Sequence, residues 1–331
     1  MTTAAAWRYV HAPSDATPLF YELRPSAAST DPLAERAPPT PVVLLDGIGC
    51  DGYIWRYLAP ALANHTVVHG HYRGHGRSAP PVDPDRVDIA DLADDIDGVI
   101  ADAGLPPAVL IGHSMGVQVA LEIYRRHPGR VAALVLVCGA PGSPLRTFTA
   151  TASLEDVLPR IQGLLAKTPR MANWLSRSLF PTRLAYEVAA RLEIQRDLVD
   201  PRDFMPYLVG MSQIDTRLFV SMLRAIGRHS AEDVLPTVKV PTMVVAGGRD
   251  GFTPPSRSRE MAAAIPGAEL LEVPEGSHTA PIERADLIND GILAFVARHA
   301  GGGAAPGAPD TDVVDDPTAP TASDDDRAAS G

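Results

Sequence analysis

Cysteine is scarce in this chain of 331 residues, where Cys50 and Cys138 are the only two. A single pair forms neither a disulfide framework nor the repeated spacing of a structural zinc site. The sequence also lacks the H-E-x-x-H pattern and any cluster of cysteine and histidine. We therefore expect no metal site, and we interpret both cysteines as small, buried hydrophobic residues near strand ends.

Long apolar runs are missing as well, although 45% of the residues are hydrophobic. No stretch approaches the roughly 18 consecutive apolar residues of a membrane span. The first residues lack a charged segment followed by a long apolar core, which argues against a secretory signal. The net charge is −11 and there is no basic stripe, so no nucleic-acid surface is expected. These absences predict a cytoplasmic protein that acts on a small molecule, and they leave the oligomeric state open.

The residues from Ala300 onward differ in composition from the rest of the chain. They are mostly Gly, Ala, Pro, Thr and Asp, and they include seven Asp and one Arg. Such a segment cannot bury a core, so we expect a disordered acidic tail. The predicted organisation is a first core segment at 1–141, a helical cap at 142–235, a second core segment at 236–299 and the tail at 300–331.

Short apolar runs alternate with amphipathic helical patterns along most of the chain. Two runs, at 7–10 and 19–23, predict an antiparallel hairpin. Further strands are expected at 42–45, 66–68, 108–111, 131–137, 242–246 and 269–273, and helices at 54–62, 88–103, 117–124, 257–264 and 287–299. Such alternation builds a parallel sheet with helices on both faces. The predicted fold is α/β, with a doubly wound, mostly parallel sheet of eight strands and an inserted helical cap.

The alternation stops between about residues 142 and 235, which show helical patterns and no strand pattern. A helical block inserted after a strand lies naturally over the carboxyl ends of the strands, where open α/β sheets bind ligands. Its methionines and aromatic residues either pack the cap helices together or line a substrate pocket. The aromatic residues concerned are Trp174, Phe180, Tyr186, Phe204, Tyr207 and Phe219.

The strongest motif is Gly-His-Ser-Met-Gly at 112–116. It joins a buried strand to a helix, and its two glycines let strand and helix approach while Ser114 is held at the tip. This is the G-x-S-x-G nucleophile elbow. A serine hydroxyl needs such exposure, a nearby base and backbone N–H groups that face the developing oxyanion. We predict that Ser114 is the nucleophile and that the N–H of Met115 is one oxyanion donor.

Two further residues follow strand ends in the order expected around such a serine. Asp250 follows one late strand, and His278 follows the next. The order Ser114, Asp250, His278 predicts a nucleophile, an acid that orients the base, and the base itself. Asp215 and Asp233, both in the predicted cap, are alternative acids in poorer positions.

These residues make the sequence resemble the α/β-hydrolase superfamily in its capped form, over about 42–140 and 236–298. The resemblance rests on the GHSMG elbow, Asp250, the loop Gly276-Ser277-His278 and the turn Arg73-Gly74-His75-Gly76-Arg77-Ser78. It implies an esterase-like or lipase-like serine hydrolase that needs no cofactor. It also implies that the second oxyanion donor is the backbone N–H of Ile48.

The chain departs from this family at Asp46-Gly47, where related enzymes usually carry His-Gly. The backbone donor does not depend on that side chain, so the oxyanion hole is expected to persist. A carboxylate near a developing oxyanion is unfavourable unless hydrogen bonds hold it away. His113, beside the nucleophile, is expected to point away from the reaction and to serve the structure.

The expected reaction is hydrolysis of a carboxylic ester of a small to medium apolar substrate, through an acyl-enzyme on Ser114. Serine at the elbow separates the chain from the superfamily's epoxide hydrolases and haloalkane dehalogenases, whose nucleophile is an aspartate. The same triad also serves thioesterases, C–C hydrolases, acyltransferases and cofactor-free perhydrolases, so these reactions remain open. A non-catalytic binding protein that kept the fold is a further alternative.

A dinucleotide-binding oxidoreductase is the alternative from a different class. Gly47-Ile48-Gly49-Cys50-Asp51-Gly52 fits G-x-G-x-x-G after a strand and before a predicted helix. A Rossmann unit also needs an acid about 20 residues later to hold the ribose. That region reads Val67-Val68-His69-Gly70-His71 and contains no acid, so the glycines are better explained as a tight turn.

Overall fold

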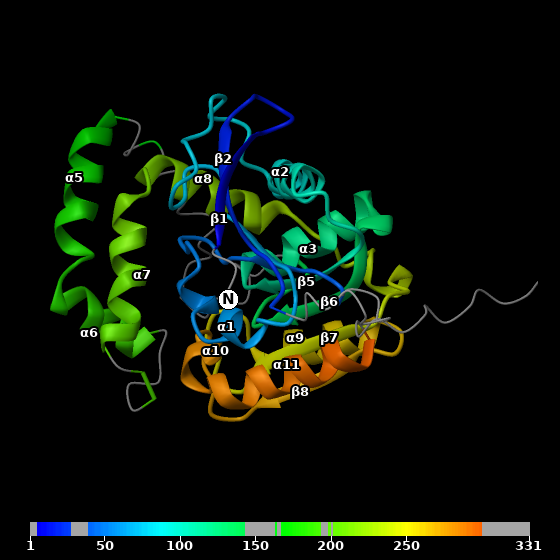
Figure 1. Cartoon of the computed structure of the whole chain (residues 1–331). Coiled ribbons are helices and arrows are strands. Elements are labelled where there is room, and N and C mark those ends of the chain that lie inside the picture. Colours follow the sequence, from blue (N-terminus) through cyan, green and yellow to red (C-terminus); the bar gives the residue numbers. More distant parts are fainter. Residues whose placement is uncertain are drawn as a thin grey trace, which may run out of the picture.

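The computed structural model of the chain describes residues 5–27, 39–142, 163, 167–192, 198–199 and 201–299. The acidic tail predicted at 300–331 lies outside these residues. Within them, the molecule is built around one sheet with helices on both faces, and a group of helices stands beside the sheet (Figure 1).

The sheet has eight strands in the order β1-β2-β4-β3-β5-β6-β7-β8. The strands are β1 (Ala6–His11), β2 (Pro18–Arg24), β3 (Val42–Leu45), β4 (Val67–Gly70), β5 (Ala108–His113), β6 (Val131–Val137), β7 (Thr242–Gly247) and β8 (Glu269–Val273). β1 pairs with β2, and β2 with β4, in antiparallel fashion. All other neighbours are parallel. The predicted hairpin and the predicted mostly parallel sheet of eight strands are both confirmed.

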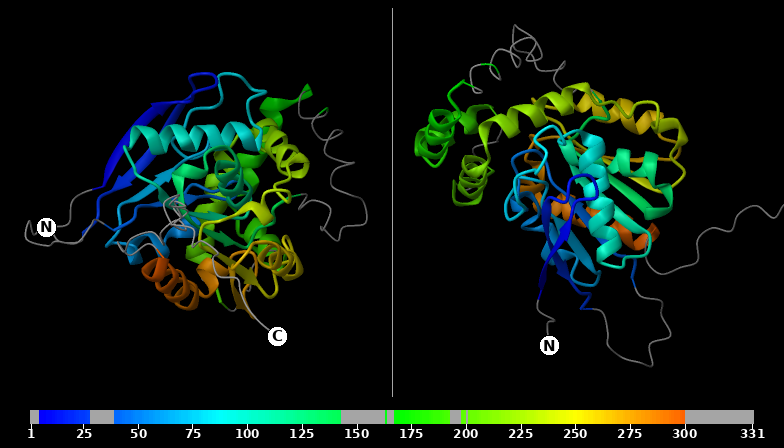
Figure 2. Two further views of the ribbon diagram at one scale, coloured as in Figure 1. Left: turned by 90° about the vertical axis from the view of Figure 1, so that its right-hand side faces the viewer. Right: turned by 90° about the horizontal axis from the view of Figure 1, so that it is seen from above.

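The central strands β3, β5 and β7 are buried along their whole length, as expected for strands covered on both faces. Helices α2 (Ile89–Asp102), α3 (Met115–Arg126) and α9 (Pro255–Ala264) contribute to the hydrophobic core on one face. The short α1 (Leu58–Ala61) and the long α11 (Ala285–His299) contribute to the core on the other face. The left view of Figure 2 shows α2 and α11 on opposite sides of the sheet.

Helix α2 illustrates how the sequence sets a helix and its buried face. Asp88 and Asp91 form a capping box at its start, which satisfies backbone N–H groups of the first turn. Ile89, Leu92 and Ile96 then recur at helical spacing and are buried against the sheet. The predicted inner face of this helix is confirmed.

The helix predicted at 54–62 is wrong as a continuous element. The structure has a 3₁₀ turn, η1 (Tyr53–Trp55), followed by the single turn of α1. Pro60 is the third residue of α1 and has no N–H to bond the carbonyl of Arg56, so a helix that continued from residue 54 would lack that bond.

The cap region contains four described helices and no described strand. They are α5 (Pro169–Leu179), α6 (Arg183–Leu192), α7 (Pro201–Gln213) and α8 (Thr216–Arg228). Figures 1 and 2 show α5, α6 and α7 beside the sheet and away from α11. Phe204 and Tyr186 are buried, as expected for packing residues, but the Trp174 side chain is exposed. The expectation for Trp174 is therefore wrong, because α5 turns its apolar side outward.

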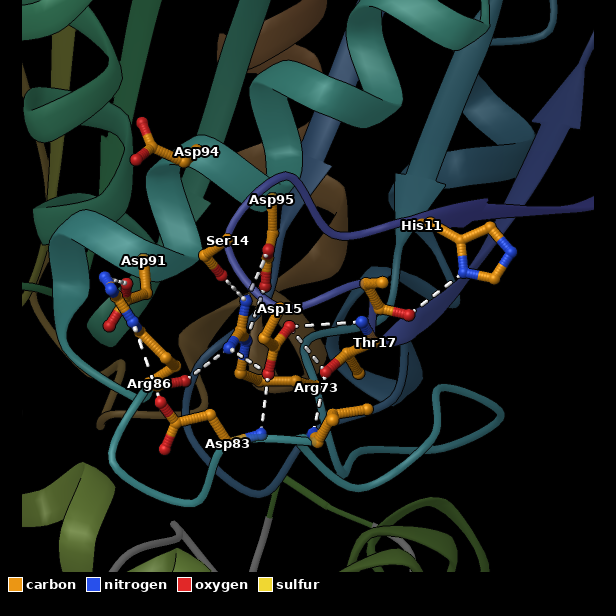
Figure 3. A network of polar contacts seen from close by, with 12 residues as sticks. His11, Ser14, Asp15, Thr17, Arg73, Asp83, Arg86, Asp91, Asp94 and Asp95 are labelled. Carbon is orange, nitrogen blue, oxygen red and sulfur yellow. Dashed lines mark hydrogen bonds and ion pairs between the residues drawn. The ribbon is translucent and has the colours of Figure 1, made fainter.

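A buried arginine joins three segments at one end of the sheet (Figure 3). The guanidinium of Arg73, which lies in the loop after β4, donates to both carboxylate oxygens of Asp95 on α2, at 2.7 and 2.6 Å. It also donates to Ser14 at 3.1 Å and pairs with Asp15 at 3.4 Å, both in the β1–β2 loop. The turn that begins at Arg73 is thus anchored from two sides before it reaches the site.

Replacing Arg73 by methionine is predicted to destabilise the fold strongly. The change keeps an apolar stem but leaves Asp95 and Asp15 buried without their cation, which costs about 3–5 kcal/mol. Urea denaturation of both proteins measures the difference in free energy of unfolding.

The matched control is Arg126→Met, which removes an arginine that pairs with Asp94 at 2.8 Å on the surface. Exposed pairs contribute only about 0–1 kcal/mol, so this variant should stay close to the wild type. Equal losses in the two variants would contradict the anchoring role of Arg73.

Candidate active site

The site is centred on a sharp turn between β5 and α3. Ser114 has φ 54° and ψ −115°, a backbone conformation that non-glycine residues rarely adopt. A Cβ added at Gly112 would lie 2.3 Å from the carbonyl oxygen of Gly116, and one added at Gly116 would lie 2.3 Å from that of Leu45. Both glycines are therefore required for the close approach of strand and helix that holds the serine at the tip.

The structure brings Ser114 together with the two other residues of the predicted set. His278 Nε2 lies 2.9 Å from Ser114 Oγ, although the residues are 164 positions apart. His278 Nδ1 lies 2.9 Å from Asp250 Oδ2. Since a carboxylate only accepts, Nδ1 carries the proton and Nε2 is free to accept the hydroxyl proton of the serine. This is the arrangement of a nucleophile, a base and an orienting acid.

Asp250 is held as a carboxylate by several donors. Its Oδ1 accepts from the backbone N–H groups of Phe252 and Thr253, at 2.8 and 2.9 Å. Its Oδ2 accepts from the Thr253 hydroxyl at 2.7 Å. Burial alone would raise the pKa of Asp250, but His278 and the Thr253 donors outweigh it, so the pKa is lowered. The carboxylate therefore stays charged and oriented beside the imidazole.

The two alternative acids have other roles. Asp215 is the N-cap of α8, where it accepts from the backbone N–H groups of Arg217 and Leu218. Asp233 is exposed and pairs with Arg125 at 2.6 Å. The structure brings neither carboxylate to His278.

The loop that carries His278 is held by a buried carboxylate that sequence reasoning missed. Glu283, in the short helix α10 (Ala280–Glu283), accepts from the Ser277 N–H and the Ser277 hydroxyl, both at 2.6 Å. It also accepts from the Thr279 hydroxyl at 3.1 Å. These bonds fix the residues on both sides of His278. The one available signal was a glutamate five positions after the histidine, which by itself is not distinctive.

His113, the last residue of β5, also supports the loop that carries His278. Its Nε2–H donates to the backbone carbonyl of His278 at 2.9 Å. Burial, together with the nearby His278, lowers the pKa of His113 to about 4, so the ring is neutral near pH 7. The structural role expected for His113 is thus specific, because the ring orients the histidine loop.

An apolar cavity of about 320 Å³ opens at Ser114. Its walls include Gly47, Ile48 and Met115 on the side of the sheet. Met115 is the first residue of α3, so its N–H belongs to the first turn, whose N–H groups have no partner within the helix. The cap helices contribute another wall, which includes Tyr207, Met211, Phe219, Leu223 and Ile226.

Asp46, the departure from the family pattern, faces away from this cavity. Its buried carboxylate lies 2.7 Å from His69 Nε2 on β4. Burial alone would lower the pKa of His69, but the carboxylate, its hydrogen bond and the more distant Glu22 and Asp51 outweigh it, so the pKa is raised. A protonated His69 thus compensates the buried negative charge of Asp46, which lies two residues before Ile48.

The glycines at 47, 49 and 52, which suggested a dinucleotide-binding motif, form the loop after β3 that carries Ile48. The N–H of Gly49 donates to His75 Nε2 at 3.1 Å. Gly52 precedes the three-residue turn η1, whereas a dinucleotide site needs the N-terminus of a longer helix for the pyrophosphate. The following strand, β4, presents His69 in place of the required acid.

Two further kinds of feature are absent from the described residues, a metal-binding cluster and a helix able to cross a membrane. No group of three or more His, Cys, Asp or Glu among them could hold a metal ion. Neither cysteine forms a disulfide and both are buried, in agreement with their interpretation from sequence. Among the described helices, none combines the length and apolar character that a membrane crossing requires.

Comparison with known proteins places this geometry in a family context. The model of the family described as alpha/beta hydrolase fold matches residues 40–285, more than half of the chain. The dihydrolipoyllysine-residue acetyltransferase component of the acetoin cleaving system from Pseudomonas putida is 30% identical over 268 residues. That alignment covers 78% of this chain but only 64% of the relative, less than two thirds of its length.

Solved structures with the same architecture include two enzymes of ester chemistry. The enol-lactonase from Burkholderia xenovorans LB400 is 25% identical, with a TM-score of 0.67 over 88% of this chain and 100% of that chain. The esterase from Exiguobacterium antarcticum is 20% identical, with a TM-score of 0.69 over 87% of this chain and 98% of that chain. The latter likeness concerns the fold alone.

The raised pKa of His69 predicts a pH-dependent contribution to stability. Since the folded protein holds the proton on His69 more tightly than the unfolded chain, the contribution is fully present below the ordinary value of 6.5. It is lost as pH rises through the raised value. The unfolding free energy of the wild type should therefore exceed that of His69→Gln by more at about pH 6 than at about pH 9, measured by urea denaturation.

A double-mutant cycle provides the control for this prediction. In an Asp46→Asn background the carboxylate is gone, so His69→Gln should show a much smaller dependence on pH. If the dependence is unchanged without Asp46, the pair is not its source.

Proposed function

We propose a serine-hydrolase mechanism for this chain, which belongs to the alpha/beta hydrolase fold family. The observation that carries the proposal is the line of contacts from Asp250 to His278 to Ser114, with both distances at 2.9 Å. Ser114, the last residue of this series, also lines the apolar cavity. The reaction proposed is hydrolysis of a carboxylic ester with a small to medium apolar acyl group.

In the first half of the reaction, Ser114 Oγ attacks the ester carbonyl carbon while His278 Nε2 takes its proton. Asp250 stabilises the imidazolium that forms. The backbone N–H groups of Ile48 and Met115 are proposed to bind the developing oxyanion. When the tetrahedral intermediate collapses, the bond to the leaving oxygen breaks and His278 returns the proton to the alcohol.

In the second half, a water molecule attacks the acyl-enzyme while His278 Nε2 accepts one of its protons. Collapse of the second intermediate breaks the bond to Ser114 Oγ, which recovers its proton from His278. The products are an acid and an alcohol, and the enzyme returns to its starting state. No cofactor takes part in these proposed steps.

The proposed acyl preference rests on the walls of the cavity. Phe219 and Leu223 from α8 and Met211 from α7 offer apolar contacts, and methionine adapts readily to different apolar shapes. The names of the similar proteins include an esterase, a lactonase and an acetyltransferase component. All three names belong to acyl chemistry, and within it we propose ester hydrolysis.

Ser114→Ala is predicted to abolish labelling by a fluorophosphonate probe and to lower ester hydrolysis by roughly 10⁴- to 10⁶-fold. The probe forms a bond to an activated serine oxygen, which this variant lacks. The control is Ser178→Ala, which removes an exposed hydroxyl on α5 and should label like the wild type. Labelling that persists in Ser114→Ala would refute the proposed nucleophile.

Narrowing the cavity is predicted to change the acyl preference. Leu223→Trp fills part of the cavity, so kcat/KM for p-nitrophenyl hexanoate should fall at least roughly tenfold relative to p-nitrophenyl acetate. Val209→Trp, on an exposed position of α7 outside the cavity walls, is the matched control. An equal fall for both esters would show that the acyl chain does not occupy this cavity.

A further inference from the structure

Helix α5 is amphipathic, but it presents its apolar side to solvent. Its inward positions, which are buried or half-buried, include Ala172, Asn173 and Ser176. Its exposed apolar residues are Met171 (62% exposed), Trp174 (66%), Leu175 (47%) and Leu179 (51%). A surface helix of a globular protein normally shows the opposite arrangement. Exposure of so many large apolar side chains on one helix indicates an interaction surface.

The next helix continues this exposure. Leu184 and Val188, one turn apart on α6, are also exposed. We call the six residues Met171, Trp174, Leu175, Leu179, Leu184 and Val188 the outer cap surface. Figures 1 and 2 show α5 and α6 at the outer edge of the molecule, on the side away from the sheet.

The charge around the outer cap surface is opposite to that of the whole chain. Residues 167–188, which span the outer cap surface, contain four cations and a single carboxylate, the half-buried Glu187, whereas the net charge of the chain is −11. The four cations, all at exposed positions, are Lys167, Arg170, Arg177 and Arg183. Arg170 and Arg177 are seven residues apart, so they lie on one side of α5, beside Trp174. The helix therefore combines an apolar side with a basic edge.

We propose that the outer cap surface docks on an anionic lipid surface. A helix with Trp and Leu on one side and cations at its edge is suited to the boundary between headgroups and acyl chains. The apolar side chains enter the acyl boundary, and the guanidinium groups remain at the level of the anionic headgroups. The chemistry recognised is thus negative charge together with an apolar layer.

A second copy of this chain fits the same surface less well. A two-fold symmetric pair places the same patch of each copy against the other. The four cations of one copy would then face the four cations of the other, against only one half-buried carboxylate, Glu187, in each copy. An anionic lipid surface has no such repulsion, so charge complementarity favours it as the partner.

The outer cap surface lies one layer of helices away from the apolar cavity. Helix α5 packs against α7 and α8. Tyr207 and Met211 of α7, and Phe219 and Leu223 of α8, line the cavity at Ser114. The docking surface and the cavity are thus built on neighbouring helices of the cap. The binding itself does not rest on the proposed function and can be measured without turnover.

The experiment uses the full chain with vesicles of phosphatidylcholine alone and of phosphatidylcholine with phosphatidylglycerol. We expect sedimentation with the anionic vesicles only, weakened by salt. Tryptophan emission should shift to the blue on binding, and Trp174→Phe should remove most of that shift. The triple variant Met171→Ser, Leu175→Ser, Leu179→Ser should bind at least roughly tenfold more weakly. Arg170→Gln and Arg177→Gln should each cost roughly fivefold.

The matched control is Val82→Ser with Leu270→Ser, which removes exposed apolar side chains far from α5 in sequence. It should bind like the wild type. Circular dichroism, compared across all variants, shows whether each remains folded. Equal binding by the control and the triple variant, or equal binding to both kinds of vesicle, would overturn the proposal.

Two other occupants of the outer cap surface would be recognised in the same experiments. A solution mass of two chains that falls to one chain in the triple variant would identify a second copy. Trp174 emission that resists acrylamide quenching without vesicles would show that another part of this chain covers the surface. Either result, without binding to the anionic vesicles, would overturn the proposal.

Discussion

The strained backbone at Ser114 is the constraint on which the arrangement of the site depends. A non-glycine residue keeps a positive φ only where its surroundings hold it there. Here β5 lies between β3 and β6, the N–H of Ser114 donates to the carbonyl of Val137, and α3 passes so close to β3 that Gly116 has no room for a side chain. The interior of the sheet therefore sets the position of the hydroxyl, and the other loops are arranged around it.

Those loops are held by side chains other than the three predicted catalytic residues. Thr253 fixes the carboxylate of Asp250, while Glu283 and His113 fix the loop of His278 from two sides. Below the Ile48 loop, Asp46 and His69 form a buried pair. Each predicted catalytic group thus has its own support from a neighbouring segment, which is the arrangement that catalysis by preorganised groups requires.

The sequence was sufficient to predict the eight-stranded sheet and the spatial meeting of Ser114, Asp250 and His278, because buried strands and the elbow have local signatures. The helical pattern at 54–62 did not show that the segment divides into η1 and α1. Asp46 directly follows β3 and His69 lies on β4, so the two meet only when these strands pair in the folded sheet. Periodicity also identifies the apolar side of α5, but it does not indicate whether that side faces the protein or the solvent. For this reason Trp174 was expected in the packing of the cap or in the pocket wall, whereas its side chain is exposed.

The Asp46–His69 pair also constrains which substitutions either position can accept. Each side chain is buried against the other, and each is tolerated because its partner is present. Restoring the usual imidazole at position 46 alone would set two rings against each other and remove the compensating negative charge. The two positions are therefore coupled: a change at either one leaves the other side chain buried without its partner, and only a double replacement avoids that state.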